Sequence, residues 1–369
     1  MGLPDAEFTV GVEEEFHLLD TGTGRLRSDA SDVLAMAGGQ LADEVEPELL
    51  RTQIETGTPV CSTLDELRTG LGRQRRELSA SAARVGCQIA ASGTWPGVTP
   101  PLPVTANDRY EDLFDRFGPT ARQQAVCGCH IHVRVDDPDV RIAVIRRSRP
   151  WLATLLALSA NSPFWEGVDT TYASYRSQVW ARWPTAGTPP PMHSRAEYDD
   201  LVDALLATGV MRDRGMLYWD VRASERYDTV EFRVADVCLR VDDAVLLAAL
   251  ARGLARSAVA AELAGRTAVD PPAEVVRLAH WQAARYGISA DLIDPPTGRP
   301  APAGEVIGHL VEHLRPALAE SGDEEFVDDA VRRVLEQGTG AARQRAAYRR
   351  AGRIDDVIRL VAKETEAAR

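Results

Sequence analysis

The chain has 369 residues, 44% hydrophobic and 26% charged, which is enough apolar material for a large core and excludes disorder of the whole chain. Its 42 basic and 55 acidic residues give a net charge of −13, which argues against a nucleic-acid binder because phosphate needs a basic face. Nearly all positive charge is arginine, with Lys363 the one lysine, and this excludes P-loop, Schiff-base and kinase-type sites that depend on a lysine.

The first two thirds of the chain mix strands and helices. Hydrophobic residues at alternate positions predict a strand over 8–19, and overlapping capping signals at Ser62–Glu66 predict a helix to about residue 85. Further strands are expected over 49–61, 87–92, 127–135, 217–222 and 229–237, the last two paired through a short turn. Proline-rich segments over 93–107 and 183–194 are expected as loops, the second being a candidate lid.

Helices are expected after Pro138 and throughout the last third of the chain. The first of them should break or kink at Pro150 before an apolar run that ends at Ala160. Beyond residue 242 the expected helices are 243–264, 272–286, 304–319, 324–337 and 353–367, with a proline-rich loop over 294–303. Strands flanked by helices without regular alternation indicate an α+β fold with a mainly antiparallel sheet.

Cysteine usage and hydropathy bear on the compartment. Five scattered cysteines are too few for a disulfide framework and fit a reducing compartment. The first residues lack the basic and apolar regions of a signal peptide. The most apolar segments, 152–160 and 244–255, are too short or interrupted by arginine to span a membrane. We therefore expect a soluble, cytoplasmic protein that binds neither nucleic acid nor membrane.

Three consecutive glutamates lie inside the first strand. Because side chains alternate across a strand, Glu14 shares a face with the apolar residues, while Glu13 and Glu15 lie on the opposite face. That face is either a solvated edge or part of a metal site, and the two interpretations are about equally supported. Glu48 and Glu55 lie in the next β segment, and each of them, considered alone, is interpreted as a surface residue.

Two further strands repeat the pattern of paired ionisable residues. His130 and His132 project to one face of their strand, which favours metal ligands over one buried and one exposed histidine. Glu231 and Arg233 also share a face, either as a cross-strand ion pair or as a metal-binding carboxylate beside a phosphate-binding arginine.

A common sheet would bring these side chains together on one face. Crowded carboxylates repel one another and need cations to stay ionised, and oxygen ligands suit Mg²⁺ or Mn²⁺. Since Mg²⁺ usually shares its ligands with phosphates, the pattern points to a Mg-nucleotide held by metals and arginines, without a P-loop or dinucleotide fingerprint.

As an ordered set, the motifs resemble the glutamate–cysteine ligase type 2 family. They are Gly11–Phe16, Cys127–Val133, Ala157–Phe164, Ser174–Arg176, Tyr218–Arg222, Thr229–Val234 and Gly338–Arg345. The resemblance implies a fold like those of glutamate–cysteine ligases and glutamine synthetase, in which a curved, mainly antiparallel sheet forms a funnel-shaped active site flanked by helices. It also implies one catalytic domain over 1–369, sheet-rich over 1–240 and with a helical flank over 241–369.

The same resemblance implies roles for particular residues. The metal ligands that the resemblance implies are Glu13, Glu15, Glu48, Glu55, His130 and Glu231. Arg233 would hold the transferring phosphate, with Glu55 beside it as the second residue at the reacting centre. The weaker candidates for ATP or for a substrate carboxylate are His132, Arg176, Arg182, Arg222, Arg343 and Arg345. Two departures from the family pattern, Trp95 and Ala223–Glu225, leave the amino-acid specificity open.

The activity implied by the resemblance is amide formation between a carboxylic acid and an amine. ATP and Mg²⁺ (or Mn²⁺) would serve an acyl-phosphate mechanism, with glutamate and cysteine as small-molecule substrates. A homodimer formed through the helical last third is compatible with the pattern. Two alternatives stay open: a metal-dependent hydrolase in which the His/Glu cluster activates water, and a catalytically silent ATP-binding relative.

Overall fold

A seven-stranded antiparallel sheet forms the centre of the computed structural model, which describes residues 8–39, 41 and 44–367. The strand order is β2-β3-β1-β5-β9-β8, and β4 pairs with the far end of β1. The strands are β1 (Val10–Asp20), β2 (Val45–Pro47), β3 (Gln53–Gly57), β4 (Cys87–Ala90), β5 (Gly128–Arg134), β8 (Val221–Ala223) and β9 (Thr229–Asp236). The predicted α+β class with a mainly antiparallel sheet is confirmed. A strand occurs in each predicted region, but the one predicted over 217–222 is reduced to Val221–Ala223.

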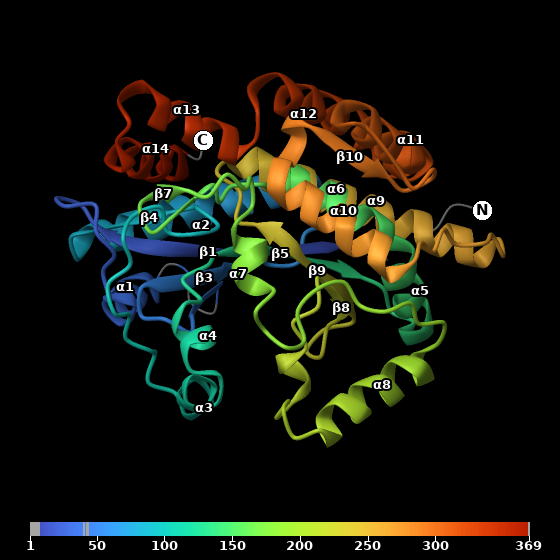
Figure 1. Ribbon diagram of the computed structural model, residues 1–369, viewed down its shortest axis with the longest axis horizontal. Helices are drawn as coiled ribbons and strands as arrows, with labels where there is room; N and C mark the ends of the chain where they lie inside the picture. Colours follow the sequence, from blue (N-terminus) through green and yellow to red (C-terminus); the bar gives the residue numbers. More distant parts are fainter. Residues whose placement is uncertain (1–7, 40, 42–43, 368–369) are drawn as a thin grey trace.

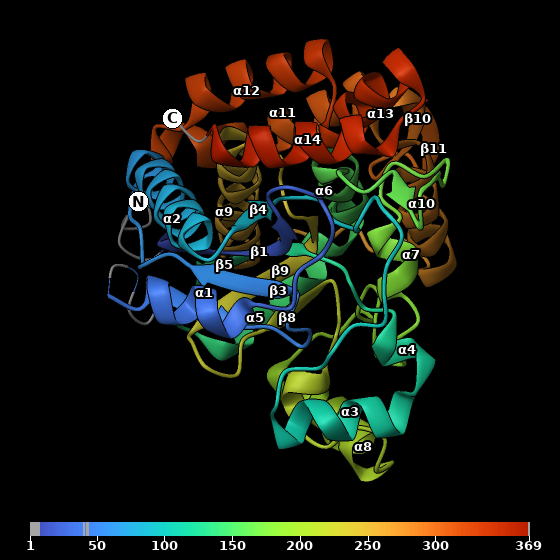
Figure 2. The same ribbon diagram turned by 90° about the vertical axis from the view of Figure 1, so that its left-hand side faces the viewer.

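Helices cover one face of this sheet (Figures 1 and 2). Those that contact the strands directly are α2 (Leu64–Arg84), α5 (Pro138–Ser148), α6 (Leu152–Ser159), α9 (Val241–Leu263) and α14 (Ile354–Glu366). An outer set packs on them: α10 (Ala273–Tyr286), α11 (Ala303–Ser321), α12 (Glu324–Gln337) and α13 (Gly340–Ala351). The apolar residues of β1 lie buried on this side, so the helical layer defines the back of the sheet.

The opposite face of the sheet looks toward shorter helices and loops (Figures 1 and 2). These helices are α3 (Asp108–Phe117), α4 (Pro119–Arg122), α7 (Arg176–Trp180) and α8 (Arg195–Ala207). None of the four was predicted. α3, α4 and α7 have ten residues or fewer, whereas α8 has a Ser194 cap and an apolar stripe (Tyr198, Leu201, Val202 and Leu205) that could have been recognised. The structure also adds α1 (Ala30–Ala37), α13, and the hairpins β6–β7 (Phe164–Trp165 and Val168–Asp169) and β10–β11 (Asp291–Asp294 and Arg299–Pro302). The second hairpin replaces the loop that we expected over 294–303.

The signals for helix ends were reliable. At the start of α2, the Thr63 hydroxyl accepts a hydrogen bond from the Glu66 backbone N–H at 3.1 Å, and the Glu66 carboxylate accepts one from the Thr63 N–H at 3.3 Å. This reciprocal capping box is the one that the sequence predicts. Pro150 separates α5 from α6 through a short 3₁₀ turn, Arg149–Trp151, as expected.

The long helix α9 contains the apolar segment 244–255, which the sequence analysis did not expect to span a membrane. It is apolar and long enough to cross a membrane, although arginines interrupt it. Two of them, Arg252 and Arg256, are buried and form ion pairs with Asp323 at 2.5 Å and Glu320 at 2.8 Å, so they do not interrupt the buried stretch. In the most apolar 18-residue window, 83% of the residues are buried inside the protein, as is typical of the core helix of a soluble protein.

Candidate active site

The sheet register brings the predicted ligands together. In the antiparallel pairing of β1 with β5, Glu13 lies opposite His130, and in the pairing of β5 with β9, His132 lies opposite Glu231. On the other side of β1, Glu15 lies opposite Glu55 on β3. Directly opposed residues of antiparallel strands share a face, so the four strands β3, β1, β5 and β9 form one surface of carboxylates and imidazoles.

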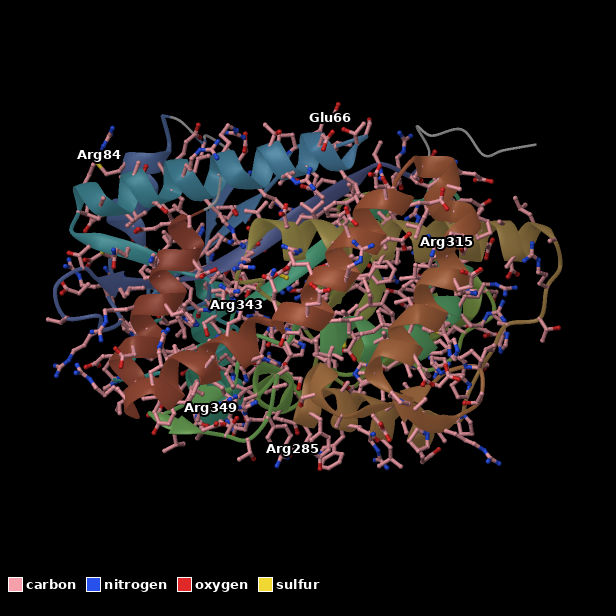
Figure 3. All side chains as sticks on the ribbon, turned by 90° about the horizontal axis from the view of Figure 1, so that it is seen from above. Glu66, Arg84, Arg285, Arg315, Arg343 and Arg349 are labelled. Atoms are coloured by element: carbon pink, nitrogen blue, oxygen red, sulfur yellow. The ribbon has the colours of Figure 1, made fainter. Side chains whose placement is uncertain are left out.

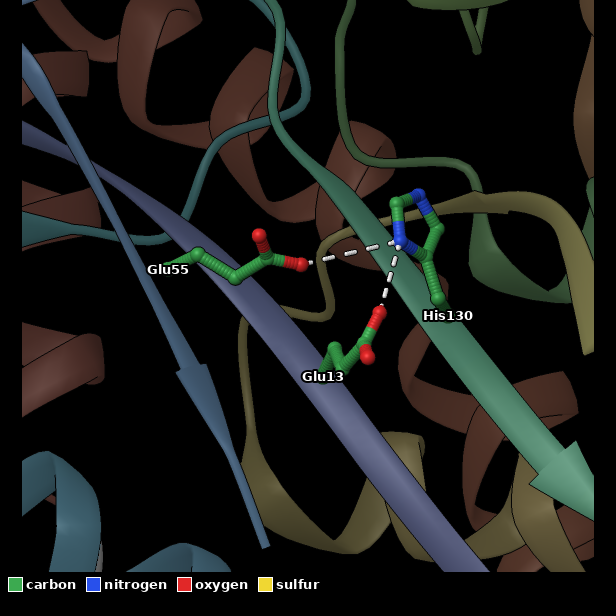
Figure 4. A group of neighbouring side chains, drawn as sticks. All are labelled: Glu13, Glu55 and His130. Carbon is green, nitrogen blue, oxygen red and sulfur yellow. Dashed lines mark hydrogen bonds and ion pairs between the residues drawn. The ribbon is translucent and has the colours of Figure 1, made fainter. Parts of the chain in front are cut away.

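Glu13, Glu55 and His130 form the first group of potential metal ligands (Figure 4). The Nδ1 atom of His130 lies 3.3 Å from the nearer oxygen of Glu13 and 3.8 Å from an oxygen of Glu55. One ligand atom from each residue falls within 4.8 Å of the others. Two carboxylates and one imidazole at this spacing can hold a divalent cation and leave positions open for other ligands.

A second group consists of Glu13, His132 and Glu231. Here the Nε2 atom of His132 lies 3.3 Å from the other oxygen of Glu13, and its Nδ1 atom lies 2.9 Å from the Thr229 hydroxyl. A hydroxyl on the second ring nitrogen is the kind of contact that orients a metal-binding histidine. Glu13 therefore belongs to both groups and offers one oxygen to each.

The charges on this face are only partly balanced. Burial alone would raise the pKa of Glu13, but hydrogen bonds and positive charge from His130 and His132 hold it well below the usual value. Burial, followed by repulsion from Glu13 and Glu48, raises the pKa of Glu55 well above the usual value. Burial, followed by the charge of Glu15, raises the pKa of Glu48 to about 7. Carboxylates so placed would be stabilised in their ionised form by bound cations, which agrees with a metal site.

Glu15 and Glu48, which were also predicted ligands, lie beside the two groups and outside both. The Glu15 carboxylate accepts a hydrogen bond from the Gly128 N–H at 2.6 Å, and the Glu48 carboxylate accepts one from the Leu49 N–H at 2.5 Å. Both line a cavity that opens next to Arg233. Their position suits contact with a substrate as well as with a metal.

The two arginines at Glu231 differ in their remaining contacts. Arg222 donates to both oxygens of Glu231, at 2.7 and 3.2 Å, and to the carbonyl oxygens of Gly215 and Leu217. Arg233 also pairs with Glu231, but its Nε has no hydrogen-bond partner in the described part of the chain, and the side chain lines the cavity. Arg222 is thus held by the protein itself, whereas Arg233 keeps a donor for a ligand.

Arg176 is buried to 2% exposure and makes no ion pair with any residue that the structure describes. Its guanidinium stacks 5.5 Å from the Trp180 ring centroid, and its one hydrogen bond from the side chain is a long one of 3.5 Å to the Arg233 carbonyl oxygen. Burial raises the pKa of the nearby Asp236 carboxyl and the charge of Arg176 opposes that rise, so Asp236 balances part of the charge of the guanidinium. Its Nε has no hydrogen-bond partner in the described part of the chain, which suits this side chain to receiving an anion.

Gly128 makes this packing possible, since a Cβ there would collide with the Arg176 guanidinium and lie 3.0 Å from His130 Nε2. We expect Gly128→Ala to lower turnover by at least about tenfold, because displacing a reacting group by about 1 Å is costly. Steady-state ADP release measures this loss. Gly308→Ala, where nothing lies within 4 Å of the new Cβ, is the matched control and should keep full turnover. Equal turnover in both variants would contradict this role of Gly128.

Other candidates lie away from the cluster. Arg343 pairs with Glu364 on α14 at 2.5 Å, and Figure 3 shows it within the layer of C-terminal helices. Arg345 pairs with Asp169 at 2.7 Å, and Arg182 donates to the Gln123 side chain at 2.7 Å. Arg343 and Arg345 have no acidic residue near them in the sequence. In the fold, Glu364 and Asp169 from other segments pair with Arg343 and Arg345. The role of Arg343 or Arg345 toward ATP stays a prediction.

Trp95, one of the departures, is buried against His17, with ring centroids 5.8 Å apart, and packs in the core beneath α14. It does not line the cavity at Arg233. The aromatic residues that do line this cavity are Tyr110, Trp180, Trp183 and Tyr218. Only Tyr218 belongs to a motif recognised in the sequence, and the four come from three separate segments of the chain, which no local pattern links.

The model of Glutamate-cysteine ligase family 2 (GCS2) matches residues 9–362. The chain belongs to this family. Among its relatives, the proteins named "Putative glutamate--cysteine ligase 2-2" in Frankia alni and Mycolicibacterium vanbaalenii are 46% and 44% identical over 371 and 357 residues. Each match covers 97% of this chain and 97% or 98% of the relative. This GCS2 membership supports an ATP-dependent carboxylate–amine ligase.

Solved structures show the same fold as this GCS2 chain. A bifunctional glutathione synthetase from Pasteurella multocida superposes with a TM-score of 0.72 at 16% identity, covering 99% of this chain and 53% of that longer protein. The glutamate–cysteine ligase of Francisella tularensis, solved in complex with AMP, gives a TM-score of 0.69 at 12% identity and covers 98% of this chain and 89% of that one. The chain spans about half of the first structure and most of the second.

Proposed function

We propose that this protein uses ATP and two or more divalent cations to join the side-chain carboxylate of glutamate to an amine. One observation carries the proposal: two groups of His and Glu ligands share Glu13 on one sheet face, directly beside Arg233 and Arg176. The substrate glutamate follows the names of the relatives, which also name cysteine as the amine.

The donor set fits Mg²⁺ or Mn²⁺. Carboxylate oxygens predominate in both groups, each contains one imidazole, and Glu13 can bridge two ions with its two oxygens. Glu13, Glu55 and His130 would hold one ion, and Glu13, His132 and Glu231 the other. When bound, such ions neutralise the negative charge of ATP phosphates and of the transition state.

The reaction has two steps. A carboxylate oxygen of the acid attacks the γ-phosphorus of ATP, the bond to ADP breaks, and an acyl phosphate forms. The amine nitrogen then attacks the carbonyl carbon, loses a proton, and expels inorganic phosphate to leave an amide. In the first step the Arg233 side chain, which lines the cavity, stabilises the charge on the phosphoryl oxygens, and Arg176 supplies a second guanidinium.

Arg176 also favours the ligase over the metal-dependent hydrolase. A hydrolase site needs metal ligands and a water, whereas a buried, unpaired guanidinium beside those ligands is suited to a phosphate or a carboxylate. Turnover separates the ligase from a catalytically silent relative. A cytoplasmic location and a homodimer that assembles through the helical last third remain predictions.

We expect EDTA to reduce ADP release in the presence of ATP, glutamate and an amine to the level without enzyme. Excess Mg²⁺ or Mn²⁺ should restore the rate, because the carboxylates of both groups need a cation to engage phosphate. Coupled measurement of ADP checks this, and chelation by EGTA, which binds Mg²⁺ weakly, is the control. Full ADP release in EDTA would contradict the proposed function.

A further inference from the structure

A cavity of about 200 Å³ opens on the site face of the sheet beside the two ligand groups. Glu15, Glu48 and Arg233 line the end nearest the cluster. Since one water needs roughly 10–15 Å³, a cavity of this size accepts a molecule much larger than water. Its occupant would lie against the residues to which we assign phosphoryl transfer.

The rest of the cavity wall is mostly aromatic and aliphatic, with Arg109 and Gln124 as its further polar side chains. Its aromatic residues are Tyr110, Trp180, Trp183 and Tyr218, and its aliphatic residues include Leu49 and Leu113. The ring centroid of Tyr218 lies 5.2 Å from that of Trp180 and 5.1 Å from that of Trp183, so these three rings form a continuous surface. Trp183 is 4% exposed and Leu113 is also 4% exposed, so this wall is fixed by the core behind it.

The position of the cavity limits which reactant it can hold. The adenine of ATP is separated from the γ-phosphate by the ribose and two further phosphates, so it cannot fill a cavity that begins at Arg233. The acid and the amine, by contrast, must both come within bonding distance of the transferred phosphoryl group or of the carbonyl carbon made from the acid. One of these two reactants is therefore the occupant.

The charges at the cavity favour the amine. Glu15 and Glu48 present carboxylates to it, while Arg109 at its lining is paired with Asp213 and Arg233 is paired with Glu231. Aromatic faces next to carboxylates form a favourable environment for an amine that has an ammonium group and an apolar side chain. An acid bound here would add negative charge beside the carboxylates of Glu15 and Glu48.

We propose that this cavity binds the amine substrate, and that this amine carries an aromatic or large aliphatic side chain in place of the small thiol of cysteine. The inference rests on the proposed ligase function and deepens it. Cysteine would leave most of the aromatic wall in contact with water, whereas a phenyl or isobutyl group would cover it. Each methylene placed in an apolar pocket changes selectivity by about tenfold or more.

The test measures ADP release at saturating Mg-ATP and glutamate with cysteine, alanine, leucine and phenylalanine. We expect kcat/KM for phenylalanine or leucine to exceed that for cysteine and for alanine by at least about tenfold. A preference for cysteine over both large amines would overturn the inference, although the ligase itself would stand. Absence of ADP release with every amine would instead count against the proposed function.

Two neighbouring variants on α3 locate the effect. Leu113→Trp places an indole into this cavity, while Phe114→Trp enlarges a residue that lines a different cavity, together with Leu102 and Trp165. We expect L113W to lower kcat/KM for phenylalanine at least about tenfold and to change that for alanine little, with F114W unchanged for both. Equal loss for all amines in L113W would contradict the assignment.

Calorimetric titration tests the inference by measuring binding of the amine without any reaction. Phenylalanine titrated into the wild-type protein should bind more tightly than alanine in the presence of Mg²⁺ and a non-hydrolysable ATP analogue. L113W should lose this difference in affinity, and F114W should keep it. If L113W folds poorly, Leu113→Ala, which enlarges the cavity, replaces it and should also change the difference. Equal binding of phenylalanine and alanine by the wild type would overturn the assignment of the cavity.

Discussion

Glu13→Gln should lower ATP-dependent amide formation by on the order of 10³-fold or more, with the fold intact. Glutamine keeps the shape of the side chain but removes the charge that both ligand groups share. A variant of any other ligand disables one group, whereas this one disables two. Amide product measured by mass spectrometry, together with ADP release, checks the loss, and thermal unfolding checks the fold.

Glu312→Gln is the matched control for this variant. It makes the same chemical change on α11, where the Glu312 side chain is 77% exposed and far from the site face. Its activity should equal that of the wild type. If Glu13→Gln retained more than a tenth of the wild-type rate at saturating Mg²⁺, the shared-ligand account of Glu13 would be wrong.

Glu14→Gln, one residue further along β1, should instead lower the free energy of unfolding by about 3–5 kcal/mol. Glu14 faces the helical layer, where its carboxylate accepts hydrogen bonds from Arg75 at 2.5 and 2.9 Å. Both side chains are fully buried, and Arg75 also donates to the carbonyl oxygens of Cys238 and Leu239. Removing the negative charge leaves a buried guanidinium without its counterion. Urea unfolding monitored by fluorescence measures the change.

A double variant separates the ion pair from its surroundings. Replacing a buried ion pair by apolar residues of similar size is often neutral, so Glu14→Leu with Arg75→Met should recover most of the stability lost in Glu14→Gln. A loss below about 1 kcal/mol in the single variant would mean that Arg75 finds another partner. The contrast between Glu13 and Glu14 follows from the alternation of side chains along a strand.

Local periodicity was enough to assign faces. Because side chains alternate along a strand, the sequence predicted that Glu13 and Glu15 lie on the face opposite to that of Glu14. It also predicted that His130 and His132 share a face, and the register of β1 with β5 agrees. The register itself could not be derived, because it depends on pairing between strands more than a hundred residues apart. The opposition of Glu13 to His130 and of His132 to Glu231 therefore required the structure.

Contacts between distant segments explain where the sequence prediction fell short. The sequence does not distinguish the roles of Arg222 and Arg233. Only the fold shows that Arg222 donates hydrogen bonds to the carbonyl oxygens of Gly215 and Leu217. Arg343 looks free in sequence because its partner, Glu364, comes from another helix. The cavity wall is built from residues near 110, 180 and 218, brought together by packing alone. Such sites carry no periodic signal that a sequence pattern could reveal.

The most direct test of the central claim follows an oxygen atom. Glutamate labelled with ¹⁸O in its side-chain carboxylate is incubated with Mg-ATP, an amine and the enzyme, and the inorganic phosphate is examined by mass spectrometry. An acyl-phosphate ligase transfers one carboxylate oxygen to phosphate for each amide formed, and Glu13→Gln should show neither product. Amide formed with unlabelled phosphate, or with the label in AMP, would contradict the account.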